Sequence, residues 1–140
     1  MSARAAVRAL LKAKVEDLGY TALEYRDDDD AVTDDELPFV LIQQAGSIEV
    51  GRREGTTGGT LEHVGSFFLS FAAADRDTAE AMLTATADAL LTDYSLGGEV
   101  QEVVPVSYAD EENEGRDYAA IVLEIRITFC TAHNDWSTLI

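Results

Sequence analysis

Apolar residues recur along this chain in two periods, one typical of helices and one typical of strands. The first helical stripe follows Ser2, which can cap a helix, and ends near Gly19, a plausible stop signal. A second stripe follows Asp77-Thr-Ala-Glu80, which resembles a capping box, and runs to about residue 94. The two stripes predict amphipathic helices. Their apolar positions are Val7, Leu10, Leu11, Val15 and Leu18 in the first, and Ala79, Met82, Leu83, Thr86, Leu90 and Tyr94 in the second.

Between and after these helices, apolar residues alternate with polar ones and predict strands. The strands cover about residues 39–44, continued by 48–53 after a bend at Gly46, then 61–74, 100–108 and 121–129. The glycines at 55, 58 and 59 predict the tip of a long hairpin. Pro105 cannot donate to a strand ladder, so its strand is predicted to be an edge strand or to carry a bulge.

These elements predict one α+β domain over residues 1–140. We expect a mostly antiparallel sheet of about four to five strands with a long hairpin, packed against two helices. Residues 132–140 form a C-terminal tail that ends in apolar residues and carries the only tryptophan, Trp136. Such a tail is expected to dock, either on its own domain or on a partner.

The charge is strongly unbalanced, with 27 acidic against 10 basic residues and a formal net charge of −17. This balance argues against a protein that grips nucleic-acid phosphates, which requires a Lys/Arg surface. Adjacent carboxylates repel and need water, so two acidic segments are predicted to be exposed loops. The residues concerned are Asp27, Asp28, Asp29 and Asp30 in the first, and Glu111 and Glu112 in the second. The first segment lacks the spacing of a calcium loop, and no metal site is predicted in the chain.

The sequence contains no recognisable catalytic or cofactor-binding motif. Cys130 lies in a strand-like run and is interpreted as a small buried side chain, and His63 as a polar core or interface residue. The glycine-rich turn lacks the Lys-Ser/Thr ending of a phosphate loop, and no Gly-x-Ser-x-Gly turn is present. We therefore predict no enzyme and no cofactor. Without a signal peptide or an apolar stretch of about 18 residues, the chain is expected to be cytoplasmic when made, away from membranes.

The few basic residues are the candidates for contacts between proteins. Arg4, Arg8 and Lys12 repeat every fourth residue, which predicts either a solvated face or an intersubunit contact. Arg126 shares a strand face with Glu124, where a cross-strand or intersubunit ion pair is expected. The full candidate interface consists of Arg4, Arg8, Lys12, Arg52, Arg53, Glu54, Arg126, Trp136, Leu139 and Ile140.

The order of the predicted elements and the sequences of several segments resemble those of a known protein family. A leading helix is followed by an acidic loop into Leu37-Pro-Phe-Val-Leu-Ile42, and then by the strand Ser66-Phe-Phe-Leu-Ser-Phe71. A helix from Asp75-Arg-Asp-Thr-Ala-Glu-Ala-Met82 to Ala89-Leu-Leu91 comes next, before two strands, Val100–Tyr108 and Tyr118–Thr128. This arrangement resembles the tail-terminator proteins of long-tailed phages (minor tail protein U-like), which also occur in phage-derived gene transfer agents. The resemblance covers roughly residues 5–131.

The resemblance implies a structural protein of the virion tail or neck, assembled in the host cytoplasm. Members of the family close into a ring, usually a hexamer, that caps the tail tube and offers its other face to a head-closure or connector protein. They have no catalytic residues and no cofactor. DNA passes through the ring without specific binding, and an acidic lumen would repel its phosphates. Alternatives are another neck or head-closure protein, an acidic cytoplasmic interaction module or DNA-mimicking inhibitor, and, last, a small enzyme.

Overall fold

The computed structural model describes residues 2–24, 34–52, 59–111 and 117–140 and shows an α+β fold. Two helices are present in these ranges, α1 (Ala3–Asp17) and α2 (Arg76–Thr92), together with a short 3₁₀ helix, η1 (Asp34–Glu36). The strands are β1 (Thr21–Leu23), β2 (Phe39–Arg52), β3 (Thr60–Ala73), β4 (Glu102–Asp110), β5 (Ala119–Ala132) and β6 (Asp135–Leu139).

The strands form one six-stranded sheet in the order β1-β2-β3-β5-β4, with β6 also paired to β5. All neighbours are antiparallel except β1, which runs parallel to β2. The sheet is therefore mixed and larger than the antiparallel sheet of four to five strands that we predicted. The additional strands are β1, which has three residues, and β6, which pairs with β5 only at Thr131 and Ala132.

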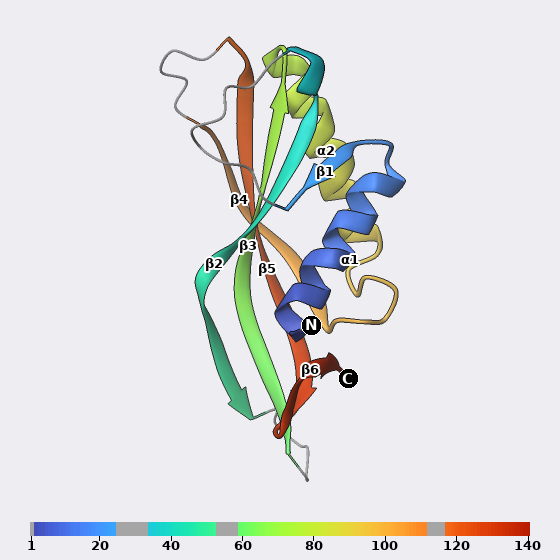
Figure 1. The fold of residues 1–140 in the computed structure, drawn as a ribbon, viewed down its shortest axis with the longest axis vertical. Helices are drawn as coiled ribbons and strands as arrows, with labels where there is room; N and C mark the ends of the chain where they lie inside the picture. The colour runs from blue at the N-terminus through green and yellow to red at the C-terminus, as the bar shows by residue number, and fades with distance from the viewer. Residues whose placement is uncertain (1, 25–33, 53–58, 112–116) are drawn as a thin grey trace.

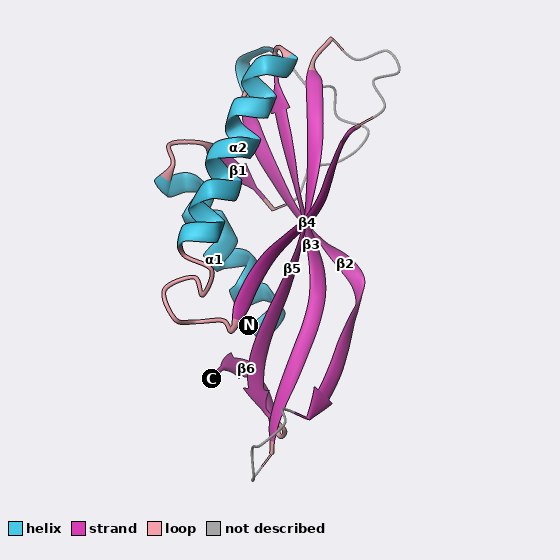
Figure 2. Cartoon of the chain, turned by 180° about the vertical axis from the view of Figure 1, so that it is seen from behind, coloured by secondary structure: helices cyan, strands magenta, loops and turns pink. Residues whose placement is uncertain are grey.

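Both helices cover the same face of a strongly twisted sheet, as Figures 1 and 2 show from opposite sides. The core lies between them and the sheet. α1 contributes Val7, Leu11 and Val15 to this core, all essentially inaccessible to solvent. The alternation predicted for β3 and β5 is confirmed, because every second residue of both strands is buried on the helix-facing side. These residues are Phe67, Leu69, Phe71 and Ala73 of β3, and Ile121, Leu123, Ile125, Ile127 and Phe129 of β5.

The long hairpin of β2 and β3 is confirmed, and its far half extends past the helices (Figure 1). The pairing register of β2 shifts between Gln44 and Ile48, which agrees with the predicted bend at Gly46. Ile48 then pairs with Gly65, where a Cβ atom would lie 2.7 Å from the Ile48 Cγ1. Glycine at this position therefore gives the Ile48 side chain its space beside β3.

β4 is the edge strand of the main strand path, and its register shifts between Pro105 and Ser107. Pro105 cannot donate a ladder hydrogen bond, which predicted either an edge strand or a bulge, and the structure has both. Beyond Val103 the strand is largely exposed, with 40% of Val104, 43% of Val106 and 70% of Tyr108 accessible. The edge therefore leaves apolar side chains at the surface.

Two predictions for α2 were wrong. The helix is capped by Asp75 and not by Asp77, because Asp75 is extended and its Oδ1 accepts from the Thr78 backbone N–H at 2.7 Å. The Thr78 hydroxyl donates to the second oxygen of Asp75, so both carboxylate oxygens have partners there. At the other end Tyr94 lies beyond the helix and is 57% exposed, so it is not part of the apolar stripe.

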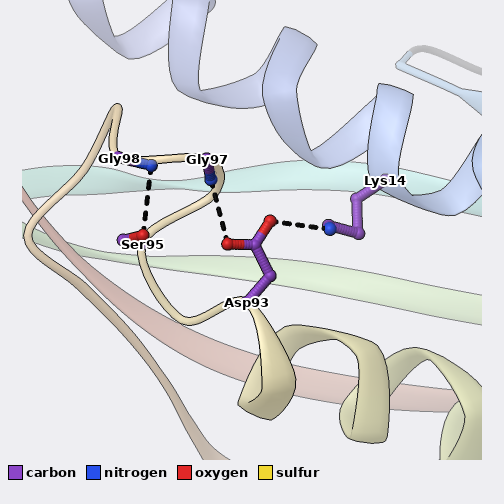
Figure 3. A network of polar contacts seen from close by, with 5 residues as sticks. All are labelled: Lys14, Asp93, Ser95, Gly97 and Gly98. Carbon is purple, nitrogen blue, oxygen red and sulfur yellow. Dashed lines mark hydrogen bonds and ion pairs between the residues drawn. The ribbon is translucent and has the colours of Figure 1, made fainter.

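A polar network joins the end of α1 to the turn after α2 (Figure 3). Lys14 Nζ lies 2.8 Å from Asp93 Oδ2, and Asp93 Oδ1 accepts from the Gly97 backbone N–H at 3.0 Å. The Gly98 N–H donates to the Ser95 hydroxyl in the same turn. Gly97 and Gly98 have φ values of 72° and 86°, which side chains disfavour, so glycine permits this tight reversal.

Candidate functional site

A cavity of about 350 Å³ lies beside the first turn of α1. We call it the His63 cavity. It lies at the far half of the hairpin, where α1, β2, β3, β5 and β6 meet. Its lining residues are Ser2, Ala3, Arg4, Ile48, Val50, His63, Phe129 and Trp136.

His63 forms one wall of this cavity and is only 4% exposed. Its ring stacks on Phe129 with the centroids 4.9 Å apart and the planes 7° from parallel. Its Nε2 lies 2.9 Å from the Thr131 hydroxyl oxygen, and that hydroxyl donates to the Ala132 carbonyl. Thr131 Oγ1 therefore accepts from a protonated Nε2, which leaves Nδ1 as an acceptor. Burial lowers the pKa of His63 from its usual value of 6.5, so the ring is neutral at pH 7.

Trp136 forms the wall next to His63 and belongs to the tail. It meets the His63 ring edge-on, with the centroids 4.9 Å apart, and its Nε1 donates to the His133 carbonyl. The tail docks on its own domain through β6, and the Ile140 N–H donates to the Cys130 carbonyl. Leu139 packs against the core, whereas Trp136 and Ile140 remain 53% and 56% exposed.

The basic stripe of α1 is divided between two places. Arg4 lines the His63 cavity, whereas Arg8 and Lys12 line a shallow groove on α1. This groove also includes Glu16, whose Oε1 is 3.9 Å from Lys12 Nζ. The Arg8 Nε is buried without a hydrogen-bond partner within the described ranges. The three basic residues are half-buried, so the stripe is not simply a solvated face.

Arg126 lies on the face of the sheet that carries no helix. It is exposed and pairs with Ser66 of β3 and Val104 of β4. The nearby Glu124 accepts a hydrogen bond from the Ser66 hydroxyl at 3.0 Å. Among the described residues no carboxylate lies within 4.0 Å of Arg126, so a cross-strand ion pair does not form there, and the intersubunit ion pair stays a prediction.

The other predicted residues are not brought together at one place. Glu111 is half-buried rather than in an exposed loop, and its Oε1 accepts from the Ser70 hydroxyl at 2.9 Å. Arg52 pairs through its backbone with Leu61, and Cys130 is buried as predicted. Outside the described residues lie Asp27, Asp28, Asp29, Asp30, Arg53, Glu54 and Glu112.

The His63 cavity was missed by the sequence analysis. The available signal was that His63 shares the inward face of β3 with Phe67, and that the tail carries the only tryptophan. No group of three or more His, Cys, Asp or Glu side chains suited to a metal occurs among the described residues. Nor does any helix within them have the length and apolarity to cross a membrane.

Comparison with models of known protein families gives no match for this chain, and comparison with curated proteins gives none either.

Proposed function

We propose that this protein is a structural subunit that assembles with copies of itself. We further propose that it forms a ring at the head–tail junction of a phage-like particle, where it caps the tail tube and joins the tail to the head. The observation that carries this proposal is the uncovered face of the sheet around Arg126. Both helices pack on the other face, so here strand residues remain available to a second protein.

The composition of this uncovered face supports a protein contact rather than a solvated surface. Val104 is 40% exposed, and Val64 and Phe68 of β3 are half-buried on the same face. Arg126 stands among them without a carboxylate partner within the residues described. A face that combines partly exposed apolar side chains with an exposed cation suits a partner that brings apolar side chains and a carboxylate.

Charge provides the second support. Each copy carries a formal charge of −17, so copies repel one another unless their contacts place cations against carboxylates. The chain has only 10 basic residues, and Arg126 is exposed with no carboxylate partner among those that the structure describes, so it is available for such a contact. Complementary charges of this kind set the register of subunits more than they add affinity. The same negative charge disfavours binding to DNA passing through the ring.

The proposal is tested by measuring the mass in solution by light scattering over a range of protein concentration and salt. Electron microscopy of the largest species would accompany this measurement. We expect a ring with about six times the subunit mass of 15.2 kDa. If the chain is monomeric in solution, binding to the ends of purified tail tubes decides the question. A chain that is monomeric throughout and does not bind tube ends would contradict the proposed function.

A further inference from the structure

We propose that the His63 cavity binds a carboxylate with an apolar body and an amide or hydroxyl donor, of the kind found in an N-acylated apolar amino acid. This inference does not depend on the proposed function, because a ring of subunits requires no ligand at this place. A volume of about 350 Å³ falls within the range of small-ligand pockets, roughly 300–1,000 Å³.

The apolar body of the ligand is matched by the walls of the cavity. Ile48, Val50, Phe129 and Trp136 supply aliphatic and aromatic surface from β2, β5 and the tail. Val50 is 41% exposed and Trp136 is 53% exposed, although both line a concave site. A flat or branched apolar group placed between them would remove this surface from water, which is the main source of affinity for such a ligand.

The carboxylate of the ligand would pair with Arg4, which lies in the first turn of α1. Arg4 is half-buried and has no carboxylate within 4.0 Å among the residues described, in a chain with 27 acids. Ser2 and Ala3 line the same cavity, and the Ser2 hydroxyl oxygen accepts from the Ala5 N–H. The remaining first-turn N–H groups of a helix lack intrahelical partners and favour a negative charge nearby. An anion at this end of the cavity therefore meets a cation and a positive helix terminus.

The hydrogen-bond donor is matched by His63. The ring is only 4% exposed and lines the cavity. Its Nε2 is hydrogen-bonded to the Thr131 hydroxyl. No partner for Nδ1 occurs in the described ranges. With the proton on Nε2, Nδ1 can accept from an N–H or O–H of a ligand. Nδ1 is not among the buried polar atoms that lack a partner, so it is open to solvent, and a ligand that supplies the donor replaces water there and gains orientation.

Trp136 makes the proposal directly measurable, because it is the only tryptophan and lies in the cavity wall. The intact protein would be titrated with N-acetyl-phenylalanine, which does not absorb where tryptophan is selectively excited. We expect a saturable change in Trp136 emission. The matched neutral probe, N-acetyl-phenylalaninamide, should bind at least about tenfold more weakly because it lacks the charge that pairs with Arg4.

Substitutions then test whether Arg4 is the cation that pairs with the carboxylate of the ligand. Arg4→Gln should weaken N-acetyl-phenylalanine about tenfold and leave the neutral amide unchanged. Arg126→Gln is the matched control, because it removes a cation from the opposite face of the sheet and should change neither. A peptide that ends in a free phenylalanine distinguishes the source of the ligand. Binding of the peptide as tightly as the free acid indicates the end of a polypeptide, and exclusion of the peptide indicates a small molecule.

Two results would overturn the proposal. One is a Trp136 emission that does not saturate with any of these probes at millimolar concentration, checked by calorimetry. The other is equal affinity for the acid and the amide, or an affinity for the acid that Arg4→Gln does not change.

Discussion

Lys14 Nζ lies 2.8 Å from Asp93 Oδ2, and this ion pair joins the last turn of α1 to the residue that caps the end of α2. Asp93 also orders the following turn, because its other oxygen accepts from the Gly97 N–H. The hydrogen bond from Lys14, followed by the one from Gly97, lowers the pKa of Asp93 from its usual value of 3.8. One carboxylate therefore connects the two helices and the reversal that leads into β4 (Figure 3).

Asp93→Asn should lower the stability of the fold at neutral pH. Asparagine keeps an acceptor for Gly97 but loses the charge that faces Lys14. Because the folded pKa is depressed, this stabilisation is present above pH 3.8 and is lost as the pH falls through the lower folded pKa. Urea unfolding of both proteins should show a difference at neutral pH that shrinks in acid. Glu80→Gln is the control, since its pair with Arg76 is exposed and should contribute little.

His63 should give the protein a separate pH dependence in a higher range. Burial lowers its pKa from 6.5, so the unfolded chain binds a proton at a higher pH than the folded chain does. Burial of the neutral His63 ring therefore costs no stability above pH 6.5, and the free energy of unfolding decreases as the pH falls below that value. His63→Phe keeps a ring against Phe129 and should remove this part of the slope in a plot of unfolding free energy against pH. An unchanged slope in His63→Phe would contradict the assignment.

Much of the fold could be predicted from the sequence because its largest elements have strong periods. β3 and β5 alternate over most of their length, and a strand buried on one face must do so. β1 could not be predicted, since three residues are too few to establish a period and its pairing depends on β2. The cap of α2 was misplaced because Asp75 and Asp77 have the same capping chemistry, and only the backbone decides between them.

The His63 cavity could not be predicted for a different reason. Its walls come from the start of α1, the far halves of β2 and β3, the end of β5 and the tail. These segments are far apart in the sequence, so no spacing relates Arg4, His63 and Trp136. Their proximity follows from the antiparallel register that sets His63 opposite Phe129, and from the return of the chain through β6. Arg126 was identified because its exposure follows from the same alternation that buries Ile125 and Ile127.

Arg126→Glu should weaken assembly while leaving the subunit folded. The substitution places a carboxylate where the proposed contact needs a cation, and the side chain is exposed, so the fold loses little. Light scattering should show a smaller mass at the same concentration, with an unchanged urea midpoint at dilution. Arg126→Lys keeps the charge and should retain most of the assembly. Unchanged assembly of Arg126→Glu at both low and high salt would exclude this residue from the contact.

Gly65→Ala should destabilise the hairpin by about 1–3 kcal/mol through crowding. The new Cβ would lie 2.7 Å from the Ile48 Cγ1, an atom near the backbone that cannot swing away freely. Gly51→Ala is the control in the same hairpin, because a Cβ there meets nothing within 4 Å. Adding Ile48→Ala to Gly65→Ala should recover part of the loss, because it removes the clash. Equal stability of the two single alanine variants in urea would contradict this reading of the close approach.

Thr86→Val should stabilise the protein by about 1 kcal/mol, because it removes a buried polar atom without a partner. Thr86 is fully buried on the sheet-facing side of α2, and its hydroxyl has no hydrogen-bond partner in the structure as described. Valine has nearly the same shape and replaces the hydroxyl with a methyl group that packs against the core. Thr86→Ala removes the same hydroxyl but also a buried methyl group, so it should be less stable than Thr86→Val. Thermal or urea unfolding would measure both, and a less stable valine variant would show that the hydroxyl has a partner in solution.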